Sequence, residues 1–358
     1  CRSWRCSPCS SIATWSGSSP GCRRSSPPRS TTTGTTPAPE TPRIEIETPS
    51  LNGAISLLGG RIDQLSLREY RETLDPGADT VTLLSPVGSN HAYYALFGWA
   101  PGQGLNADTV PGANTLWQVE SGDRLTPDTP LTLVWDNGAG LTFRREISVD
   151  QDYMFSVTQS VENTGSATAS LAPYGILARH GEPADLKNFF ILHEGAISMV
   201  DGELTETDYD DFEPATNHSE IAVEENGWIG FTDHYWMTTL IPDTQGAQFT
   251  TFQDTRRNIY QTTAKQRTET LEPGESVSVS TRLFAGAKEW DTIRTYQNEA
   301  GIDRFLDSID WGWFFFLTKP IFAVLHWLNV TLAGMGLTGS MGWAIIGLTL
   351  LLKALLLP

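Results

Sequence analysis

The sequence predicts a mainly β protein, in which a large antiparallel β-sandwich precedes an interfacial amphipathic helix and the start of a transmembrane helix. Three observations support this fold class. Short runs of alternating apolar and polar residues, separated by Gly, Pro, Asn and Asp, fill the chain from residue 40 to residue 287. The same region lacks the long helical patterns that a parallel α/β fold requires. After residue 310 the chain becomes rich in aromatic and aliphatic side chains.

The charge of the chain excludes one broad class of partner. Its 358 residues include 24 Lys and Arg and 42 Asp and Glu, which gives a formal net charge of −18. A surface with this surplus of acids repels a phosphate backbone, so we expect no nucleic acid as a partner. A chain of this length can bury a large core, either in one β domain or in two smaller ones.

Residues 1–39 differ in composition from the rest of the chain. They hold all four cysteines, no Asp or Glu, and many Arg, Ser, Thr and Pro residues. Cys6 and Cys9 have the C-x-x-C spacing of redox and zinc sites, but no histidine precedes His91 and no apolar periodicity surrounds them. We therefore expect a disordered segment and linker, or a stretch translated out of frame, rather than a metal site or a membrane span.

The predicted β-sandwich domain covers residues 40–287, and its clearest element is a hairpin at residues 131–149. Leu131, Leu133 and Trp135 alternate with polar residues and so share one face of the first strand. The turn sequence DNGAG supplies residues that tolerate a positive φ. In the next predicted strand, four apolar residues again fall on one side: Tyr153, Phe155, Val157 and Val161.

The hydrophobic period changes after the last predicted strand. Residues 288–310 have apolar side chains at helical spacing and predict a helical connector. Its apolar members are Trp290, Ile293, Phe305, Leu306 and Ile309.

Residues 311–330 predict an amphipathic helix that lies in a membrane interface. Lys319 and His326 are seven residues apart and share one helix face, while aromatic rings, which favour the headgroup region, cover the rest. The residues assigned to the interface are Trp311, Trp313, Lys319, Pro320, His326 and Trp327. Pro320 argues against a straight, deeply buried helix, and the alternative is a core helix of a soluble domain. The residues expected to point toward lipid or other membrane helices are Phe315, Phe322 and Leu325.

Residues 341–358 predict the start of a transmembrane helix. The run is shorter than the roughly 20 apolar residues that cross a bilayer, so we expect a span that continues beyond it. A helix that begins near Gly342 places Lys353 about 16 Å into a hydrocarbon core of about 30 Å. A lysine at that depth costs about 3 kcal/mol, so it should face water or a partner. The alternative is that its long side chain snorkels to the headgroups.

Several stretches of the sequence resemble the YidC family of membrane protein insertases. The acidic β domain, the aromatic segment WGWFFFLTKPIFAVLHWLN, a short Gly-rich link and MGWAIIGLTLLLKALLLP follow one another as at the start of that family's membrane core. Within the β domain, PSLNGAISLLGGRIDQLSLREYRET, TLLSPVGSNHAYYALFGW and GWIGFTDHYWMTTLIP are similar to the periplasmic domain of Gram-negative members. The resemblance implies a β-supersandwich, a fold similar to that of sugar mutarotase domains.

The resemblance also implies a function and a place in the cell. Such a protein is a multi-pass protein of the bacterial inner membrane, with its β domain in the periplasm. It assists nascent membrane proteins to insert and fold in the lipid bilayer, alone or with Sec translocon components. The resemblance implies no enzyme activity, no cofactor and no metal. The family's first span and its later core spans have no counterpart in this sequence, so we expect this chain alone to insert nothing.

One residue role is implied by the resemblance. In the family a positively charged residue lines a hydrophilic groove that is open to the cytoplasm and to lipid, and Lys353 is the matching position. Many relatives have Arg there, so this sequence keeps the charge but replaces a planar guanidinium with a compact ammonium.

Two other functions stay open. Because mutarotases use a histidine acid and a carboxylate base, the domain is alternatively a membrane-tethered module that binds or processes sugars. The histidines available for this chemistry are His180, His193, His218 and His234, with Glu182, Glu194 and Asp233 near them in sequence. Such neighbours are more often structural, and a pair in the deepest cleft would distinguish an enzyme. The third function is a tethered domain that binds chaperones or Sec components.

Overall fold

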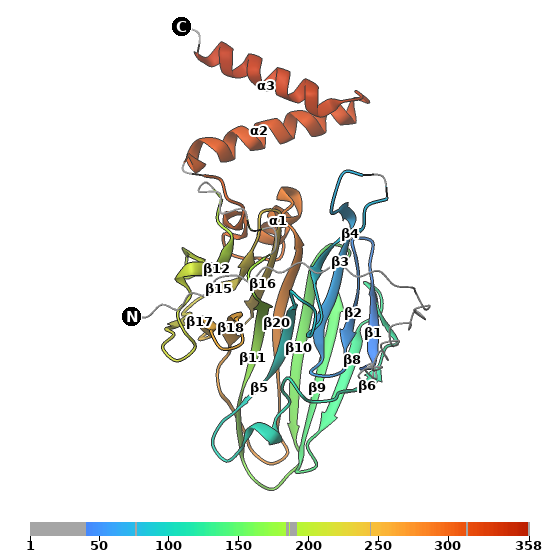
Figure 1. Ribbon diagram of the computed structural model, residues 1–358, viewed down its shortest axis with the longest axis vertical. Coiled ribbons are helices and arrows are strands. Elements are labelled where there is room, and N and C mark those ends of the chain that lie inside the picture. Colours follow the sequence, from blue (N-terminus) through green and yellow to red (C-terminus); the bar gives the residue numbers. More distant parts are fainter. Residues whose placement is uncertain are drawn as a thin grey trace, which may run out of the picture. The chain divides into compact units, whose positions relative to one another are not determined.

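The computed structural model describes residues 41–75, 77–183, 186, 192–243, 245–312 and 314–356. The segment predicted for residues 1–39 lies outside them. Two sheets stack face to face and helices follow, so the predicted mainly β class is confirmed (Figure 1).

The larger sheet has eleven strands in the described part of the chain. Their order is β14-β17-β18-β11-β5-β3-β2-β1-β7, with β4 paired to β3 and β19 paired to β11. Its strands pair antiparallel except for β1 with β7. The strands are β1 (Arg43–Glu47), β2 (Leu51–Ser56), β3 (Arg61–Arg71), β4 (Thr80–Leu84), β5 (Tyr93–Pro101), β7 (Arg124–Leu125), β11 (Ala169–His180), β14 (Glu220–Ala222), β17 (Gln248–Asp254), β18 (Ile259–Lys265) and β19 (Glu269–Leu271).

The smaller sheet has nine strands among the described residues, all paired antiparallel in the order β13-β12-β15-β16-β20-β10-β9-β8-β6. The strands are β6 (Gln118–Ser121), β8 (Leu131–Asp136), β9 (Leu141–Val149), β10 (Met154–Asn163), β12 (Gly195–Val200), β13 (Glu203–Asp208), β15 (Gly227–Thr232), β16 (Trp236–Pro242) and β20 (Ser276–Ala287). Two short 3₁₀ helices lie in the loops of the sandwich: η1 (Ala107–Thr109) and η2 (Tyr209–Asp211).

The predicted hairpin is confirmed, because β8 and β9 pair antiparallel across the expected turn. Asn137 Oδ1 accepts hydrogen bonds from the backbone N–H groups of Ala139 and Leu141. Gly138 and Gly140 have φ angles of 69° and 95°, in the left-handed region that favours glycine. The turn therefore forms for the reason that its sequence indicates.

The core between the sheets is built from aromatic and aliphatic side chains. Burial alternates with exposure along β9 and β18, as expected for strands with one covered face. The four residues predicted to share one side of β10 and its approach are all buried. Fully buried rings come from both sheets: Phe97, Trp99 and Phe249 from the larger, and Phe143, Phe155, Trp228, Phe231 and Phe284 from the smaller.

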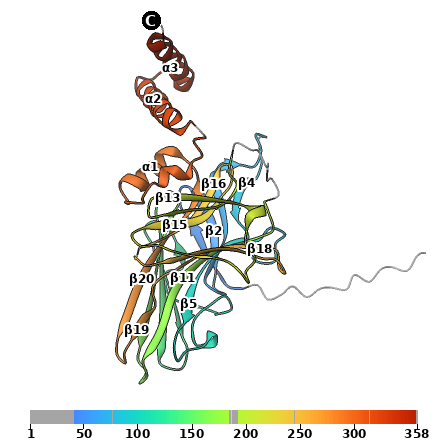
Figure 2. The ribbon, with the colours of Figure 1, turned by 90° about the vertical axis from the view of Figure 1, so that its left-hand side faces the viewer.

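The chain leaves the sandwich from β20 into α1 (Trp290–Asn298), then η3 (Phe305–Ser308), α2 (Phe315–Gly334) and α3 (Ser340–Leu356). Seen from the side, α1 lies next to the start of β16 (Figure 2). Between β20 and α1, the backbone N–H of Lys288 donates to the carbonyl oxygen of Tyr235, the residue before β16, at 2.9 Å. Gly301 and Arg304 both have positive φ angles, of 67° and 48°. The stretch predicted as a helical connector is therefore two short helices with a sharp turn between them.

Arg145 joins the two sheets from inside the core. It extends from β9 in the smaller sheet and is fully buried. Its guanidinium donates to the carbonyl oxygens of Gly59 (3.2 Å), Gly60 (3.0 Å) and Phe97 (2.6 Å), which belong to the larger sheet or its β2–β3 turn. It also lies 4.4 Å from the ring centroid of Trp117. Burial lowers the pKa of Arg145 to about 9, so the group is still a cation at neutral pH.

We predict that Arg145→Ala destabilises the protein by at least about 3 kcal/mol, because it leaves a void and three buried carbonyl groups without a donor. The matched control is Arg144→Ala, since Arg144 is the preceding residue but forms exposed ion pairs with Glu120 and Glu162. That control should cost less than about 1 kcal/mol. Denaturant unfolding of the whole chain in detergent measures both, and equal losses would contradict the cross-sheet role.

Candidate membrane-facing site

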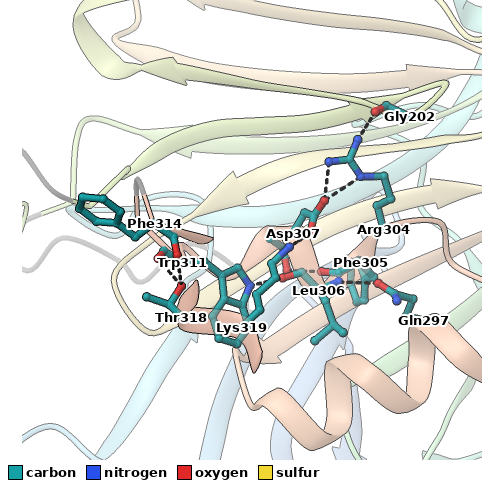
Figure 3. Close-up of polar contacts among 11 residues, drawn as sticks. Gly202, Gln297, Arg304, Phe305, Leu306, Asp307, Trp311, Phe314, Thr318 and Lys319 are labelled. Carbon is teal, nitrogen blue, oxygen red and sulfur yellow. Dashed lines mark hydrogen bonds and ion pairs between the residues drawn. The ribbon is translucent and has the colours of Figure 1, made fainter. Parts of the chain in front are cut away.

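Asp307 joins the sandwich to α2 through a shared carboxylate (Figure 3). Its Oδ1 accepts from Lys319 Nζ at 2.5 Å, and its Oδ2 accepts from Arg304 Nε at 2.7 Å and Nη2 at 2.6 Å. Arg304 also donates through Nη1 to the carbonyl oxygen of Gly202, in the turn between β12 and β13. The Asp307 side chain is only 15% exposed, so solvent screens these ion pairs less than it screens surface pairs. We call Arg304, Asp307 and Lys319 the Asp307 anchor.

The start of α2 is fixed by further hydrogen bonds around Trp311 (Figure 3). Trp311 Nε1 donates to the carbonyl oxygen of Leu306, and Thr318 Oγ1 donates to the carbonyl oxygen of Trp311, both at 2.9 Å. Lys319 Nζ lies 5.9 Å from the centroid of the Trp311 ring, within range of a cation–π interaction. The predicted interface residues Trp311 and Lys319 therefore lie together.

A second contact ties α2 to α1 two turns further along. His326 Nε2 lies 3.1 Å from Asp291 Oδ1, and the His326 ring is 4.7 Å from the ring of Trp290. Lys319 and His326, which were predicted to share a face, thus both face carboxylates of the connector. Phe322 lies on this side as well, 5.5 Å from Trp290 and 5.6 Å from Trp311. Phe322 keeps 36% of its surface exposed beside these ring contacts, so its predicted orientation toward lipid or other membrane helices stays a prediction.

Helix α1 is itself fixed to the sandwich by the hydroxyl groups of buried and half-buried tyrosines. Glu289 Oε1 accepts hydrogen bonds from the hydroxyl groups of Tyr70 (2.6 Å) and Tyr153 (2.9 Å). The Tyr296 hydroxyl donates to Asp150 Oδ2 at 2.7 Å. Burial and the neighbouring carboxylates raise the pKa of all three tyrosines, so each is a neutral donor at physiological pH. The connector is therefore a rigid extension of the sandwich.

Lys288, two residues before α1, is a partly buried cation at the same end of the domain. Its Nζ donates to Thr232 Oγ1 at 2.9 Å. Burial lowers the pKa of Lys288 to about 8, although Asp233 and Asp310 oppose the shift. The site thus holds a lysine whose charge changes just above neutral pH.

Helices α2 and α3 expose large apolar side chains along their length. Residues Phe316–Gly334 form a helix long and apolar enough to cross a membrane, whereas Ser340–Leu356 is a shorter apolar helix. None of the apolar window in α2 is buried, so α2 is not the core helix considered as an alternative. The exposed side chains include Phe316, Leu317, Trp327 and Val330 of α2 and Trp343, Ile345, Ile346, Leu350 and Leu351 of α3. Such a surface requires a partner or lipid to cover it.

The two helices contact each other through small residues of α3. Ala344 is fully buried, and a side chain added at Gly347 would meet Leu328 of α2 at 3.8 Å. Ser340 Oγ lies 2.7 Å from Asn329 Oδ1. Small residues at this spacing let helices approach closely in lipid, where no hydrophobic effect drives them together.

The other residues predicted for the site form none of the ion pairs described above. Trp327 is 63% exposed, and Lys353 is exposed in the last turn of α3, without a hydrogen bond or ion pair to any residue that the structure describes. Pro320 lies inside α2, which continues through it. Trp313 lies outside the described residues. The carboxylates Asp291 and Asp307 were missed, because no spacing rule relates them to Lys319 and His326.

Among the histidines proposed for sugar chemistry, His193 has structural contacts, whereas His180 Nε2 and His234 Nδ1 are buried without a hydrogen-bond partner among the described residues. His193 Nδ1 lies 2.8 Å from Asp208 Oδ1, not beside the expected Glu194, and its Nε2 lies 2.9 Å from the carbonyl oxygen of Ala196. Both of its ring nitrogens are therefore occupied. Asp233, the neighbour of His234, instead forms a bidentate ion pair with Arg179.

Glu182 and the cavity also give no support for a catalytic pair of a histidine and a carboxylate. Glu182, the neighbour of His180, accepts a hydrogen bond from Tyr260 at 3.3 Å. A cavity of about 150 Å³ in the described part of the domain has no histidine in its lining. Within the described ranges, no three His, Cys, Asp or Glu side chains gather as a metal site requires.

Comparison with known proteins relates the chain to a family. A family model for the YidC periplasmic domain matches residues 43–324. The membrane protein insertase YidC of Ruegeria sp. (strain TM1040) is 62% identical over 317 residues, which cover 86% of this chain and 51% of that protein. The membrane protein insertase YidC of Roseobacter denitrificans is 58% identical over 327 residues, covering 89% of this chain and 53% of that protein. The chain spans about half the length of the curated relatives it matches.

Solved structures with related sheets include a galactose mutarotase related enzyme from Lactobacillus acidophilus. It is 11% identical, with a TM-score of 0.46, and covers 68% of this chain and 97% of its own. A galactose mutarotase-like protein from Lactobacillus casei is 12% identical, with a TM-score of 0.45, and covers 68% of this chain and 100% of its own. Likenesses at this level carry no argument about function.

We predict that Asp307→Asn loosens α2 from the connector, because it weakens the ion pairs to both Arg304 and Lys319. Spin labels at the exposed positions Thr295 in α1 and Val330 in α2 report their separation by pulsed electron paramagnetic resonance. The distance distribution should broaden in Asp307→Asn. Glu299→Gln removes one charge from the same connector, where that side chain has no ion pair to described residues, and should change nothing. Equal widths in all three proteins would contradict the anchor.

Proposed function

This chain belongs to the YidC family of membrane protein insertases, and we propose that it forms the periplasmic domain and the start of the membrane core of such an insertase. The observation that carries the proposal is the match over residues 43–324 to the family, joined to helices whose apolar surfaces lack cover. The complete protein would be a multi-pass protein of the bacterial inner membrane. Its substrates would be nascent membrane proteins, which it would help to insert alone or beside Sec translocon components. It would use no cofactor and change no covalent bond.

We propose that α2 lies along the periplasmic surface of the membrane although it is long enough to cross. His326 is eleven residues from the start of α2, so in a spanning helix it would lie about 16 Å deep, near the centre of the bilayer. Its partner Asp291 is 64% exposed and belongs to α1, which is fixed to the sandwich. Crossing would therefore either break both ion pairs or pull part of an acidic domain into lipid, at a cost of several kcal/mol. Lying flat keeps both pairs in water and leaves the opposite face for lipid.

Lys353 would then act from the following helix. Since α3 begins at Ser340 and Lys353 lies in its last described turn, a crossing α3 would carry the ammonium to about mid-membrane. Because the charge has no partner among the described residues, it would face a wet groove, where it would attract acidic or polar parts of an incoming chain. Snorkelling to the headgroups is the competing role for this side chain.

The flat orientation of α2 predicts equal depths at equivalent positions along the helix. Spin labels at Phe316, Ala323 and Val330 are seven residues apart and lie on one face, so an in-plane helix holds them at the same depth. A spanning helix would instead change the depth by about 10 Å at each step. Relaxation by oxygen and by a water-soluble nickel complex measures the depth in lipid nanodiscs. Graded depths would refute the in-plane orientation.

The groove role of Lys353 predicts a charge requirement. In a full-length form of the protein, Lys353→Arg should keep insertase activity, because it keeps the cation. Lys353→Ala and Lys353→Glu should impair substrates that carry negative charge near their translocated end. Insertion into vesicles of paired substrates with and without that charge measures the effect. If Lys353→Ala inserts every substrate normally while staying folded and abundant, the lysine is a topological anchor.

A further inference from the structure

Strand β13 is a free edge of the smaller sheet. It stands last in the strand order, and among the described residues it pairs only with β12. Four of its six residues are exposed, and none is buried. An edge strand carries backbone N–H and C=O groups that no neighbouring strand uses, and these groups are a template for pairing with another chain. The edge of β13 therefore offers a surface that recognises an extended polypeptide by its backbone.

The turn between β12 and β13 determines which backbone groups face outward. Asp201 and Gly202 form a two-residue turn in which both φ angles are positive, 48° and 86°. In a hairpin with such a turn, the residues next to the turn are a hydrogen-bonded pair, and hydrogen-bonded pairs alternate with pairs that are not. Counting from Glu203, the backbone N–H and C=O groups of Leu204 and Glu206 point away from β12. These are the groups that an added strand would pair with.

The same edge carries negative charge. Glu203 and Glu206 are exposed and form no hydrogen bond or ion pair with any residue that the structure describes. They are three residues apart, so they lie on opposite faces of the strand. Opposite charges on neighbouring strands stabilise strand pairing, so the edge favours a strand with lysine or arginine on both of its faces.

The charge also distinguishes this edge from other ways of using it. Two copies of the chain that paired through β13 would place acids beside acids, which destabilises strand pairing. The strand at the opposite end of the same sheet, β6, is fully exposed as well. Its acid Glu120, however, is already paired with Arg144 at 3.1 Å. Of these two edges, β13 is the one that combines outward backbone groups with unpaired acids.

We propose that β13 binds an extended, lysine- or arginine-containing segment of another protein, which adds a strand to the smaller sheet. Backbone hydrogen bonds to Leu204 and Glu206 supply the affinity, and the carboxylates of Glu203 and Glu206 select basic side chains. The proposal is independent of the insertase proposal, because it uses only residues of the β domain.

The test measures binding of a fluorescent nine-residue peptide to the chain in phosphatidylcholine nanodiscs, whose headgroups carry no net charge. The peptide contains lysines on both strand faces among threonine and valine residues. At saturation it should slow amide hydrogen exchange in residues 203–208 at least about threefold, because an added strand protects the outward N–H groups. Exchange in β6 should stay unchanged, which makes that strand an internal control.

Substitutions separate the backbone contribution from the charge contribution. Glu206→Gln keeps the backbone N–H and should weaken binding of the peptide roughly threefold. Glu206→Pro also removes the N–H and should weaken binding at least about tenfold, since proline cannot donate to a strand. Glu203→Lys combined with Glu206→Lys should bind the same peptide with glutamate in place of lysine. The matched control is Glu120→Gln in β6, which should leave the affinity unchanged.

Four results would overturn the proposal. Equal affinities of Glu206→Pro and Glu206→Gln, with exchange in β12 preserved, would mean that the backbone groups do not bind the peptide. Equal binding of the lysine and glutamate peptides to the unchanged chain would remove the charge selection. Unchanged exchange in residues 203–208 at saturation would place the peptide elsewhere. Self-association of the chain that Glu206→Pro abolishes would assign the edge to a second copy.

Discussion

The carboxylate of Asp307 sets the direction in which the chain leaves the sandwich. It is shared between Arg304, which reaches back to the β12–β13 turn, and Lys319, which belongs to the first turns of α2. A charge on an apolar helix is costly in lipid, and in the proposed in-plane orientation the carboxylate of Asp307 would keep Lys319 out of the lipid. His326, two helical turns after Lys319, is held by Asp291. The two ion pairs therefore fix α2 at two points, which define the direction of its axis.

This anchoring is effective only if the surface beneath it is rigid. The connector meets that requirement, because Glu289 accepts from Tyr70 of β3 and from Tyr153, just before β10, and Tyr296 reaches Asp150. Deeper in the domain, Arg145 joins the two sheets through three carbonyl groups. Buried polar groups of this kind add little net stability but penalise every alternative packing, because each alternative leaves a polar group unpaired. A stiff sandwich thus gives α2 a defined position relative to the domain.

Structural features that depend on residues close together in the sequence could be predicted well. The β8–β9 hairpin followed from its turn residues, and the buried face of β10 followed from strict alternation. Lys319 and His326 were correctly given one face, since a seven-residue separation is close to two helical turns. Arg145 lies two residues from both Phe143 and Ile147 and therefore falls on the same buried face of β9. Strict alternation could thus have predicted a buried cation at this position. The partners were not predictable, because Asp291 and Asp307 lie on either side of the turn at Gly301 and Arg304 and meet α2 only in the tertiary structure. The ring contacts of Phe322 with Trp290 and Trp311 were not predictable for the same reason, because they depend on tertiary packing and not on the helical period.

We propose that the domain holds α2 flat on the membrane while α3 enters it. Solid-state NMR of the ¹⁵N-labelled chain in oriented bilayers measures this directly, because an amide ¹⁵N shift depends on the angle between the helix axis and the bilayer normal. Amides of α2 should give shifts typical of a helix in the membrane plane, and those of α3 should give shifts typical of a helix near the normal. If α2 and α3 both gave shifts of helices near the normal, α2 would be a span and the two ion pairs would not hold it at the surface.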